Sequence, residues 1–371
     1  MLGEKARQSK GDNGHEGQTA KAPFHTLLRL PFGAWLMITR RRSLQLLAAG
    51  MATSLTAGCQ AAPAPAERNR SGSELKLSLA QWSLHRHLFG KSWPELAAQY
   101  SIPELVEALR QRHDTVVAGP LAPLDFAPFT RETFGITAVE YVNTFYFDKA
   151  GNDAYAAKLD RQAKDAGVES ILVMCDALGD LGAPVEADRM GVVDNHVAWL
   201  NFASALGCKA IRVNAQSDRA LAREEQSRLA ADGLRALCEK ADAYGLYILV
   251  ENHGGLSSEG AWLAETIRKV DHPLIGTLPD FGNFKVSPDL RYDPYKGVAE
   301  LMPFARGVSA KTYDFDPETG LETNLDYERL LRIVRESGFS GHIGIEYEGH
   351  HLSEVDGILA TKRLIERIYA S

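Results

Sequence analysis

The chain has 371 residues, of which 45% are hydrophobic and 24% are charged, a balance that argues against a disordered protein and suits one large or two ordinary globular domains. The formal net charge is −7, but residues 1–58 carry eight basic and three acidic side chains, so the rest of the chain holds 45 acidic side chains against 33 basic ones. An acidic body argues against nucleic acid as the main partner, because phosphate binding draws on an excess of Lys and Arg, and four cysteines are too few for a disulfide scaffold.

The N-terminal part has the order of a bacterial export signal, which runs from a basic head through an apolar middle to small residues before a cleavage point. The head is Arg40-Arg41-Arg42, and the Ser-Leu-Gln that follows it resembles a twin-arginine signal. The run from Leu55 to Cys59 resembles a lipobox, in which the cysteine becomes lipidated. A single membrane-spanning anchor is the alternative, but the apolar run over residues 46–58 is shorter than the ~20 residues that a span needs.

We therefore predict a signal region over residues 1–58, in which Met37 is a second candidate for the true start. Residues 59–74 are rich in Ala, Pro and polar side chains, a composition typical of a flexible tether. The prediction is an exported protein of a bacterium, either periplasmic or held at the membrane by a lipid anchor on Cys59, with a catalytic domain over residues 75–371.

Short apolar runs recur through residues 75–371, and most of them end in a polar residue. This pattern is typical of parallel strands that are buried on both faces. The eight predicted strands cover residues 75–83, 137–143, 170–175, 210–214, 247–252, 274–280, 306–312 and 342–347.

Amphipathic runs between these strands predict helices, and each of the clearest ones stops at a glycine. They cover residues 153–167, 187–207, 219–245 and 326–338, the last of which begins with Asp326 as a capping residue. The segment 90–123 is additional, and residues 101–112 predict a helix inserted after the first strand. Such an insertion would form a lid or wall at the mouth of a barrel.

Eight strand–helix units in about 300 residues fit a single-domain (β/α)8 TIM barrel of the α/β class. A doubly wound sheet normally has fewer strands and a glycine-rich first turn, and no G-x-G-x-x-G motif follows any predicted strand. In a TIM barrel, the residues that carry chemistry collect where the strands end at the C-terminal face. The residue that ends each predicted strand is therefore the place to search for a site.

Glu251, Asp280 and Glu346 end the fifth, sixth and eighth predicted strands, and we call them the carboxylate triad. Three carboxylates that converge on one axis repel each other unless a cation neutralises them. Oxygen ligands favour Mn²⁺ or Mg²⁺ over a soft, thiol-bound metal. Solvated strand-end carboxylates are the alternative, but three at matching heights favour a metal site. His253 lies two residues beyond Glu251 and is also predicted to face inward as a ligand.

Five fragments in the observed order and spacing resemble the xylose-isomerase-like sugar isomerase/epimerase barrels, also described as sugar phosphate isomerase/epimerase. The resemblance covers nearly all of residues 75–370. It rests on LSLAQWS at residues 77–83, AVEYVN at 138–143, VENHGG at 250–255, DFGN at 280–283 and GIEYEG at 344–349.

This resemblance implies a metal held by Glu, Asp, His and Glu from strands five to eight, and the carboxylate triad matches three of these positions. Ser309 stands where the resemblance expects the histidine, so Ser309, His253 or a water would complete the ligand set. Lys311 matches the lysine of the family's His-x-Lys motif and is expected in the pocket. We expect Mn²⁺ as the ion, with Mg²⁺, Co²⁺ or Zn²⁺ as alternatives.

The predicted chemistry is proton transfer next to the carbonyl of a keto sugar through an enediolate that the ion stabilises. By resemblance, Glu251 and Glu346 remove and return the proton, and the Lys311 ammonium stabilises the oxyanion. His196 and His272 are interpreted as ordinary surface or loop histidines. The candidate substrate-binding residues, each of which taken singly is equally consistent with a structural role, are Gln81, His85, Glu140, Asn143, Arg212, Asn214 and Asn283.

Three functions follow as hypotheses: a metal-dependent isomerase or epimerase of an unphosphorylated or keto sugar, a metal-dependent lyase or hydrolase of 3-keto-glycosides with the same site, and a non-catalytic sugar-binding lipoprotein. The export signal and the lack of a glycine-rich phosphate cradle after the last two strands favour an unphosphorylated small-molecule carbohydrate. The apurinic endonuclease branch of the superfamily needs a trinuclear, histidine-rich zinc site, which an acidic body with few strand-end histidines disfavours.

Overall fold

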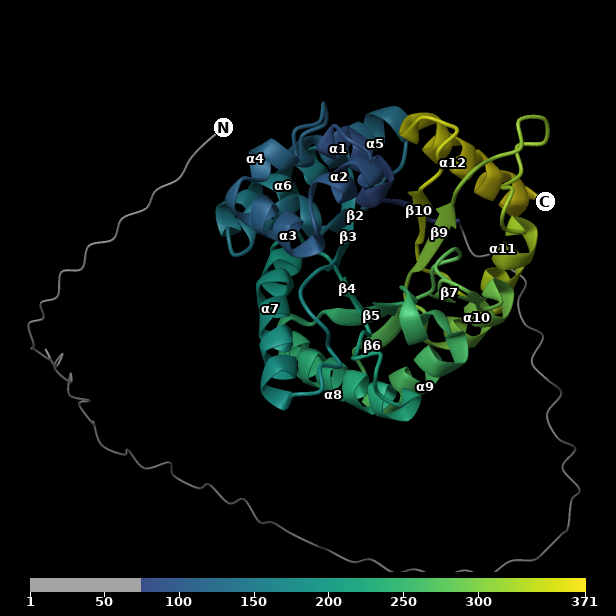
Figure 1. The fold of residues 1–371 in the computed structure, drawn as a ribbon. Helices are drawn as coiled ribbons and strands as arrows, with labels where there is room; N and C mark the ends of the chain where they lie inside the picture. Colours follow the sequence, from purple (N-terminus) through teal and green to yellow (C-terminus); the bar gives the residue numbers. More distant parts are fainter. Residues whose placement is uncertain (1–74) are drawn as a thin grey trace, which may run out of the picture. The chain divides into compact units, whose positions relative to one another are not determined.

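The computed structural model of the protein describes residues 75–371, and Figure 1 shows them as a ring of strands surrounded by helices. Within these residues, eight parallel strands form one sheet in the order β6-β5-β4-β3-β2-β1-β10-β9. Their bounds are β1 Leu77–Ala80, β2 Ala138–Val142, β3 Glu169–Met174, β4 Ala210–Asn214, β5 Tyr247–Glu251, β6 Ile275–Leu278, β9 Val308–Thr312 and β10 Ile343–Tyr347. The predicted export signal, lipid anchor and tether lie outside the described residues and stay predictions.

The two outer strands of this order, β6 and β9, also meet, so the sheet closes on itself. The backbone amide of Ser309 donates to the carbonyl of Pro279 at 2.9 Å, and Asp280 pairs with Ser309 in a parallel bridge. The result is the TIM barrel that the alternation of strands and helices predicts. Closure matters for function because it carries the C-terminal ends of all these strands to one mouth.

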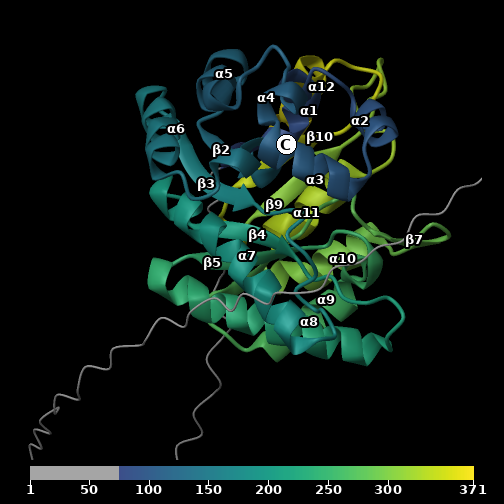
Figure 2. The ribbon, with the colours of Figure 1, turned by 60° about the vertical axis from the view of Figure 1, so that its left-hand side comes forward.

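Helices cover the outside of the barrel, as the two views in Figures 1 and 2 show. Those after β2 are α6 Asp153–Asp165, α7 Glu186–Ala205, α8 Arg223–Ala241, α9 Gly260–Val270, α10 Pro294–Leu301, α11 Tyr327–Glu336 and α12 Glu354–Ala370. The predicted helices correspond to α6, α7, α8 and α11, and the Asp326 carboxylate caps α11 by accepting from the Arg329 amide. No helix within residues 75–371 is both long enough and apolar enough to cross a membrane.

The segment between β1 and β2 is an insertion of short helices. They are α1 His85–Phe89, α2 Trp93–Gln99, α3 Ile102–Gln111, α4 His113–Val116 and α5 Phe126–Phe134. α2 and α3 each begin with a capping box, formed by Ser92 with Glu95 and by Ser101 with Glu104. α3, the predicted inserted helix, packs on the 3-10 turn Asn143–Lys149 that follows β2. The insertion therefore stands beside the mouth of the barrel, where a lid or wall was predicted.

The structure differs from the prediction at the end of β1. The predicted strand at residues 75–83 stops at Ala80, and Gln81–Leu84 forms a 3-10 turn instead. The Ser83 hydroxyl donates to the Ile345 carbonyl and accepts from the Tyr347 amide, so contacts with β10 hold this turn across the mouth. The hairpin of β7 and β8, Lys285–Ser287 and Leu290–Arg291, has no counterpart in the prediction.

The structure also shows where the cysteines and two of the histidines lie. The three cysteines within residues 75–371 are buried free thiols, as expected without a disulfide scaffold. His272 lies in the loop before β6, but the surface or loop position predicted for His196 is wrong, because His196 is buried in α7. Its Nδ1 lies 2.8 Å from the Val192 carbonyl, and this hydrogen bond satisfies the ring nitrogen that faces the helix.

Candidate metal centre

Three carboxylates from three strands meet at the mouth of the barrel. Glu251 ends β5, Asp280 follows β6 and Glu346 lies on β10, and each offers an oxygen within 4.8 Å of the other two. All three side chains are buried. The parallel closed sheet explains this convergence, because the strand ends surround one axis. The structure thus brings together the carboxylate triad that the sequence analysis selected.

The turn after β6 holds Asp280 in place. Its Oδ1 accepts hydrogen bonds from the backbone amides of Gly282 and Asn283, both at 2.7 Å. The Asn252 side chain brackets the same residue, because its oxygen accepts from the Asp280 amide at 2.8 Å and its nitrogen donates to the Asp280 carbonyl at 3.0 Å. These contacts occupy Oδ1, whereas Oδ2 faces Ser309 and Lys311 of β9.

Glu251 accepts a hydrogen bond from the described residues at only one of its two oxygens. The Asn283 side-chain nitrogen donates to Oε1 at 2.8 Å. The Arg212 Nε lies 2.8 Å from Oε2 as an ion pair, but its angle does not suit a hydrogen bond, so both atoms lack a hydrogen-bond partner within residues 75–371. A buried carboxylate oxygen without a hydrogen-bond partner is a position where a ligand is expected.

Two residues of β9 lie between Asp280 and Glu346. The Ser309 hydroxyl is 2.8 Å from Asp280 Oδ2 and 3.0 Å from Glu346 Oε2, and its single proton serves one carboxylate at a time. The Lys311 Nζ lies 3.5 Å from Asp280, 3.2 Å from Glu346 and 3.4 Å from Glu348. Lys311, expected in the pocket, therefore places a buried ammonium among three carboxylates.

Arg212 on β4 forms the second buried cation of the centre. Its Nη1 and Nη2 donate to the two oxygens of Asp176 at 2.6 and 3.3 Å, and the Asn214 amide donates to Asp176 Oδ1 at 2.9 Å. The Asn143 side-chain nitrogen donates to the Asp176 carbonyl at 3.0 Å, and its side-chain oxygen accepts from the Asp176 amide at 2.9 Å. Asn143 was predicted to bind substrate, but its amide is occupied in positioning Asp176.

Burial and charge together set the acid–base properties of the centre. Burial raises the pKa of Glu251 and of Asp280 to about 7, against the opposing effects of Arg212 and Lys311 respectively. Burial by itself would lower the pKa of Lys311, but the carboxylates of Asp280 and Glu346 outweigh it and raise the pKa well above its ordinary value. Near neutral pH, the two carboxyl groups therefore exchange protons readily while Lys311 stays charged.

Gln81 does not face the centre as a substrate-binding residue would. Its side-chain nitrogen donates to the Tyr146 hydroxyl at 2.8 Å, and its oxygen accepts from the Val142 amide at 3.0 Å. The side chain is completely buried. Because the chain turns at the end of β1, Gln81 binds the neighbouring strand β2 and supports the barrel wall.

Glu140 was also predicted to bind substrate, but it lies inside the barrel. Its Oε1 accepts from the Ser78 hydroxyl at 2.6 Å, while Oε2 is buried without a hydrogen-bond partner in the described residues. The carboxyl fills space beside Gly344, where an added Cβ would stand 2.4 Å from Oε1. Burial raises the pKa of Glu140 to about 7. Its position on β2 places it with the interior side chains of the barrel.

His85 and His253 are the two histidines that the sequence analysis assigned to the site. The His85 ring stacks on Trp82 with centroids 5.0 Å apart, and its Nδ1 lies 2.9 Å from the Trp82 carbonyl. His253 follows β5 and is not a member of the three-carboxylate cluster. Burial lowers the pKa of both histidines, so both rings are neutral near pH 7. The roles assigned to them stay predictions.

The structure adds two acidic residues that the sequence analysis did not select, Glu348 beside Lys311 and Asp176 beside Arg212. The sequence contained a signal for each. Glu348 lies two residues after Glu346, the spacing that puts two strand residues on one face. Asp176 directly follows the third predicted strand, where polar residues reach the barrel mouth.

The donors at this centre fit a hard divalent cation. The triad supplies buried carboxylate oxygens, one of them without a hydrogen-bond partner, and neither Cys nor His joins this cluster within the described residues. With the half-buried Asp176 and Glu348, the carboxylates outnumber the two cations Arg212 and Lys311. Oxygen ligands of this kind are typical of Mg²⁺ and Mn²⁺ sites.

Comparison with protein families gives a match over residues 131–369 to the family described as xylose isomerase-like TIM barrel. The chain belongs to this family. The match begins within α5 and extends through α12, so it includes every member of the carboxylate triad. Membership in the xylose isomerase-like family confirms the resemblance found in the sequence. Comparison with curated proteins gives no match.

Solved structures of xylose isomerase-like barrels share this fold. The 3-keto-D-glucoside 4-epimerase of E. coli has a TM-score of 0.54 at 15% identity, over 67% of this chain and 95% of the epimerase. The IolI protein with a bound zinc atom has a TM-score of 0.55 at 15% identity, over 80% and 98% of the two chains. A xylose isomerase-like TIM barrel protein from Mycobacterium smegmatis in complex with magnesium has a TM-score of 0.53 at 16% identity, over 81% of this chain and 97% of that protein. At these identities the likeness shows the fold, and the neighbours include an epimerase and metal-bound proteins.

Proposed function

We propose that the protein is a divalent-metal-dependent isomerase or epimerase of an unphosphorylated or keto sugar. The observation that carries the proposal is the carboxylate triad, which is buried at the barrel mouth with oxygens within 4.8 Å of one another. A structural neighbour that is a 3-keto-D-glucoside epimerase is consistent with this chemistry in the same fold. The carbohydrate is the proposed small-molecule partner.

The carboxylate triad would hold the metal. Backbone and side-chain N–H groups occupy Oε1 of Glu251 and Oδ1 of Asp280, so the ion would bind Oε2 and Oδ2 and take the place of their present contacts with Arg212 and Ser309. Ser309 or His253 would supply a fourth protein ligand, and Mn²⁺ is the ion that we propose. A bound divalent cation would supply Lewis-acid polarisation of the sugar carbonyl.

Glu251 and Glu346 are the proposed pair for proton transfer. One carboxylate would remove the proton from the carbon next to the carbonyl, and the other would return a proton to the opposite face or to the adjacent carbon. Burial raises the pKa of Glu251 to about 7, a value that suits a group that both accepts and releases a proton near neutral pH. The two residues come from β5 and β10, and because β6 and β9 lie between these strands in the closed sheet, the two carboxylates approach the centre from different sides.

Lys311 is the proposed stabiliser of the enediolate oxyanion. Its ammonium stays charged because of the surrounding carboxylates, and Asn283 further holds Nζ at 3.4 Å. Arg212 is paired with Asp176 and Glu251. The carboxylates around these two cations offset their charge, so the centre lacks the excess positive charge that a phosphate dianion needs, which supports an unphosphorylated substrate.

The test uses the full-length protein, Mn²⁺ and 3-keto-D-glucose in D₂O, followed by proton NMR. We expect deuterium to replace the proton next to the carbonyl and a rearranged sugar to form, and we expect a chelator to stop both. Glu251→Gln and Glu346→Gln should each lower kcat by about 10²–10⁴-fold. Glu225→Gln, which changes an exposed carboxylate on α8, is the matched control. Full turnover in both site variants would instead indicate a non-catalytic sugar-binding protein.

A metal-dependent lyase or hydrolase of 3-keto-glycosides is the second candidate, and a cavity beside β4 that adjoins the centre favours it. Loss of the proton next to the carbonyl prepares elimination of a substituent one carbon further on, and the same residues would serve. Incubation with a 3-keto-glycoside separates the candidates. Release of the aglycone indicates the lyase, and rearrangement without release indicates the isomerase.

We also propose that the protein is exported and that Cys59 carries a lipid. The proposal rests on the order of basic, apolar and small residues before Cys59. Fractionation of cells that express the full chain should recover it in the membrane fraction, and Cys59→Ser should move it to the periplasmic fraction. Recovery of both proteins in the cytoplasm would contradict export.

A further inference from the structure

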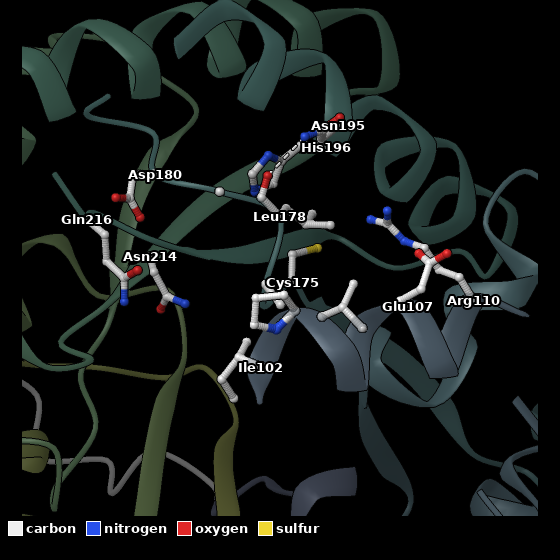
Figure 3. Close-up of a pocket in the computed structure, with 14 residues that line it drawn as sticks. Ile102, Glu107, Arg110, Cys175, Leu178, Asp180, Asn195, His196, Asn214 and Gln216 are labelled. Atoms are coloured by element: carbon white, nitrogen blue, oxygen red, sulfur yellow. Dashed lines mark hydrogen bonds between the residues drawn. The ribbon is translucent and has the colours of Figure 1, made fainter. Parts of the chain in front are cut away.

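A cavity of about 530 Å³ lies beside the metal centre, between α3 and the ends of β3 and β4 (Figure 3). α3 supplies an apolar wall of Ile102, Pro103 and Val106, and Ile102 is 54% exposed. The opposite side is polar, and Figure 3 shows its side chains around the same space. The polar lining residues from this side are Asp180, Asn195, His196, Asn214 and Gln216.

β4 connects this cavity with the metal centre. Asn214 lines the cavity and is the direct neighbour of Glu251 in the β4–β5 ladder, where adjacent strands lie about 4.8 Å apart. Asp176 Oδ1 accepts hydrogen bonds from both Asn214 and Arg212, so the centre and the cavity share a wall. A molecule held at Glu251 could therefore extend past Asn214 into the cavity.

His196 is one of the residues that line the cavity, and one nitrogen of its ring is already bonded to its own helix. Its Nδ1 bonds the Val192 carbonyl at 2.8 Å, so Nδ1 carries the proton in the neutral ring. Burial lowers the pKa of His196, which keeps the ring neutral near pH 7. Nε2 is then an unprotonated acceptor with no hydrogen bond within the described residues. This nitrogen suits the hydroxyl group of a ligand.

The loop after β3 is held in a strained conformation where it lines the cavity. Ala177 has a φ of +56°, and Gly179 has a φ of +105° with Val192 so close that an added Cβ would lie 2.6 Å from it. The Asn195 amide donates to the Leu178 carbonyl at 3.0 Å and holds the loop against α7. Strained backbone persists where the surrounding structure enforces it, and such positions cluster at ligand sites.

The charges of the lining favour a neutral ligand with many hydroxyl groups. Arg110 is the one cation among the lining residues, and Glu107 and Asp180 line the same cavity. An anion such as a phosphate would need a concentration of positive charge that the lining does not offer. Amides, carboxylates and a neutral imidazole opposite an apolar wall suit the hydroxyls and the C–H face of a sugar ring.

We propose that this cavity is a subsite for the second unit of a glycoside, so that the substrate is a keto-glycoside with a ring-sized aglycone rather than a free monosaccharide. This inference rests on the proposed function, which places the keto ring at the carboxylate triad. The aglycone ring lies against Ile102 and Val106, and one of its hydroxyl groups donates a hydrogen bond to His196 Nε2.

The test compares the methyl and the glucosyl glycosides of 3-keto-D-glucose, which share the keto ring and differ in the aglycone, as substrates of the full-length protein with Mn²⁺. Val106→Trp fills the cavity and should lower kcat/KM for the glucosyl glycoside at least about ten-fold, with the methyl glycoside within about two-fold. Arg112→Trp, at the exposed C-terminal end of α3 and outside the cavity lining, is the matched control.

A second pair of variants tests His196 without filling the cavity. His196→Asn keeps a donor for the Val192 carbonyl but removes the Nε2 acceptor, and it should lower kcat/KM for the glucosyl glycoside about three- to ten-fold. His196→Gln places an amide near the Nε2 position and should retain more of the activity. If each variant lowers kcat/KM equally for the two glycosides, or if no variant lowers it for either, the subsite is wrong. The proposed function would stay intact.

Calorimetry separates failure of the subsite from failure of the proposed function. If neither glycoside reacts but the glucosyl glycoside binds, and Val106→Trp weakens that binding at least about ten-fold, the subsite stands and the proposed reaction is wrong. If neither glycoside reacts and the wild-type protein binds the glucosyl glycoside no more tightly than the methyl glycoside, both proposals are wrong.

Discussion

Metal affinity should fall steeply when the protein is acidified from pH 8 to pH 6, because the ion competes with protons for the triad. Burial raises the pKa of both Glu251 and Asp280 to about 7. Over this pH range the ionised fraction of each group drops from about 0.9 to about 0.1. An ion that needs both carboxylates loses about ten-fold in affinity per group, or about 100-fold and 2.7 kcal/mol in total.

The free energy of unfolding should change with pH in the opposite direction in the metal-free protein. Both carboxyl groups have a raised pKa in the folded state, from ordinary values of 4.5 and 3.8, so the protonated forms favour folding. Their stabilising contribution is present below about pH 4 and is lost as the pH rises through about 7. Added Mn²⁺ should therefore raise Tm most at pH 8 and least at pH 6.

Titration calorimetry of Mn²⁺ into the full-length protein at pH 6, 7 and 8 measures the effect. Glu251→Gln removes one titrating ligand, so the Kd for Mn²⁺ should change only about ten-fold between pH 6 and pH 8. The variant should bind Mn²⁺ more weakly than the wild-type protein at each pH. Glu225→Gln, on the exposed surface of α8, should keep the 100-fold change. A Kd for Mn²⁺ that is constant from pH 6 to pH 8 would refute the argument from buried, proton-binding carboxylates.

Two further predictions concern stability and are measured by denaturant unfolding. Gly344→Ala places a Cβ 2.4 Å from Glu140 Oε1 and should lower the free energy of unfolding by about 1–3 kcal/mol. Gly191→Ala, on α7 with no atom within 4 Å of the added Cβ, should instead raise it by up to about 1 kcal/mol, and a loss there as large as that of Gly344→Ala would contradict the packing argument. Glu354→Ala leaves two backbone amides of α1 without their acceptor and should cost about 2–6 kcal/mol, whereas an unchanged midpoint would show that water replaces the carboxylate.

The amino-acid sequence by itself determined the barrel and the three carboxylates at its mouth. Strands in a parallel barrel are buried on both faces, so they appear as short apolar runs, and β4 was predicted with its observed bounds. The residue that ends such a run reaches the mouth whatever the neighbouring helices do. Glu251, Asp280 and Glu346 could therefore be selected from their positions alone.

Only the tertiary structure decided where the other polar side chains point. Gln81 and Asn143 also follow strands, yet their amides bind backbone groups of neighbouring elements. The difference depends on the turn that each strand enters and on the space left by other strands, as Gly344 leaves space for Glu140. These distances join residues far apart in the chain, so no local pattern encodes them.

The cavity beside β4 likewise depends on tertiary packing. The inserted helix α3 was predicted from its amphipathic run, but nothing in that run indicates that it would face the loop after β3 and a histidine of α7. Local sequence determines which element forms, because hydrogen bonds and apolar periodicity act over a few residues. The closed barrel decides which elements meet, because closure brings strand ends from along the whole chain around one axis.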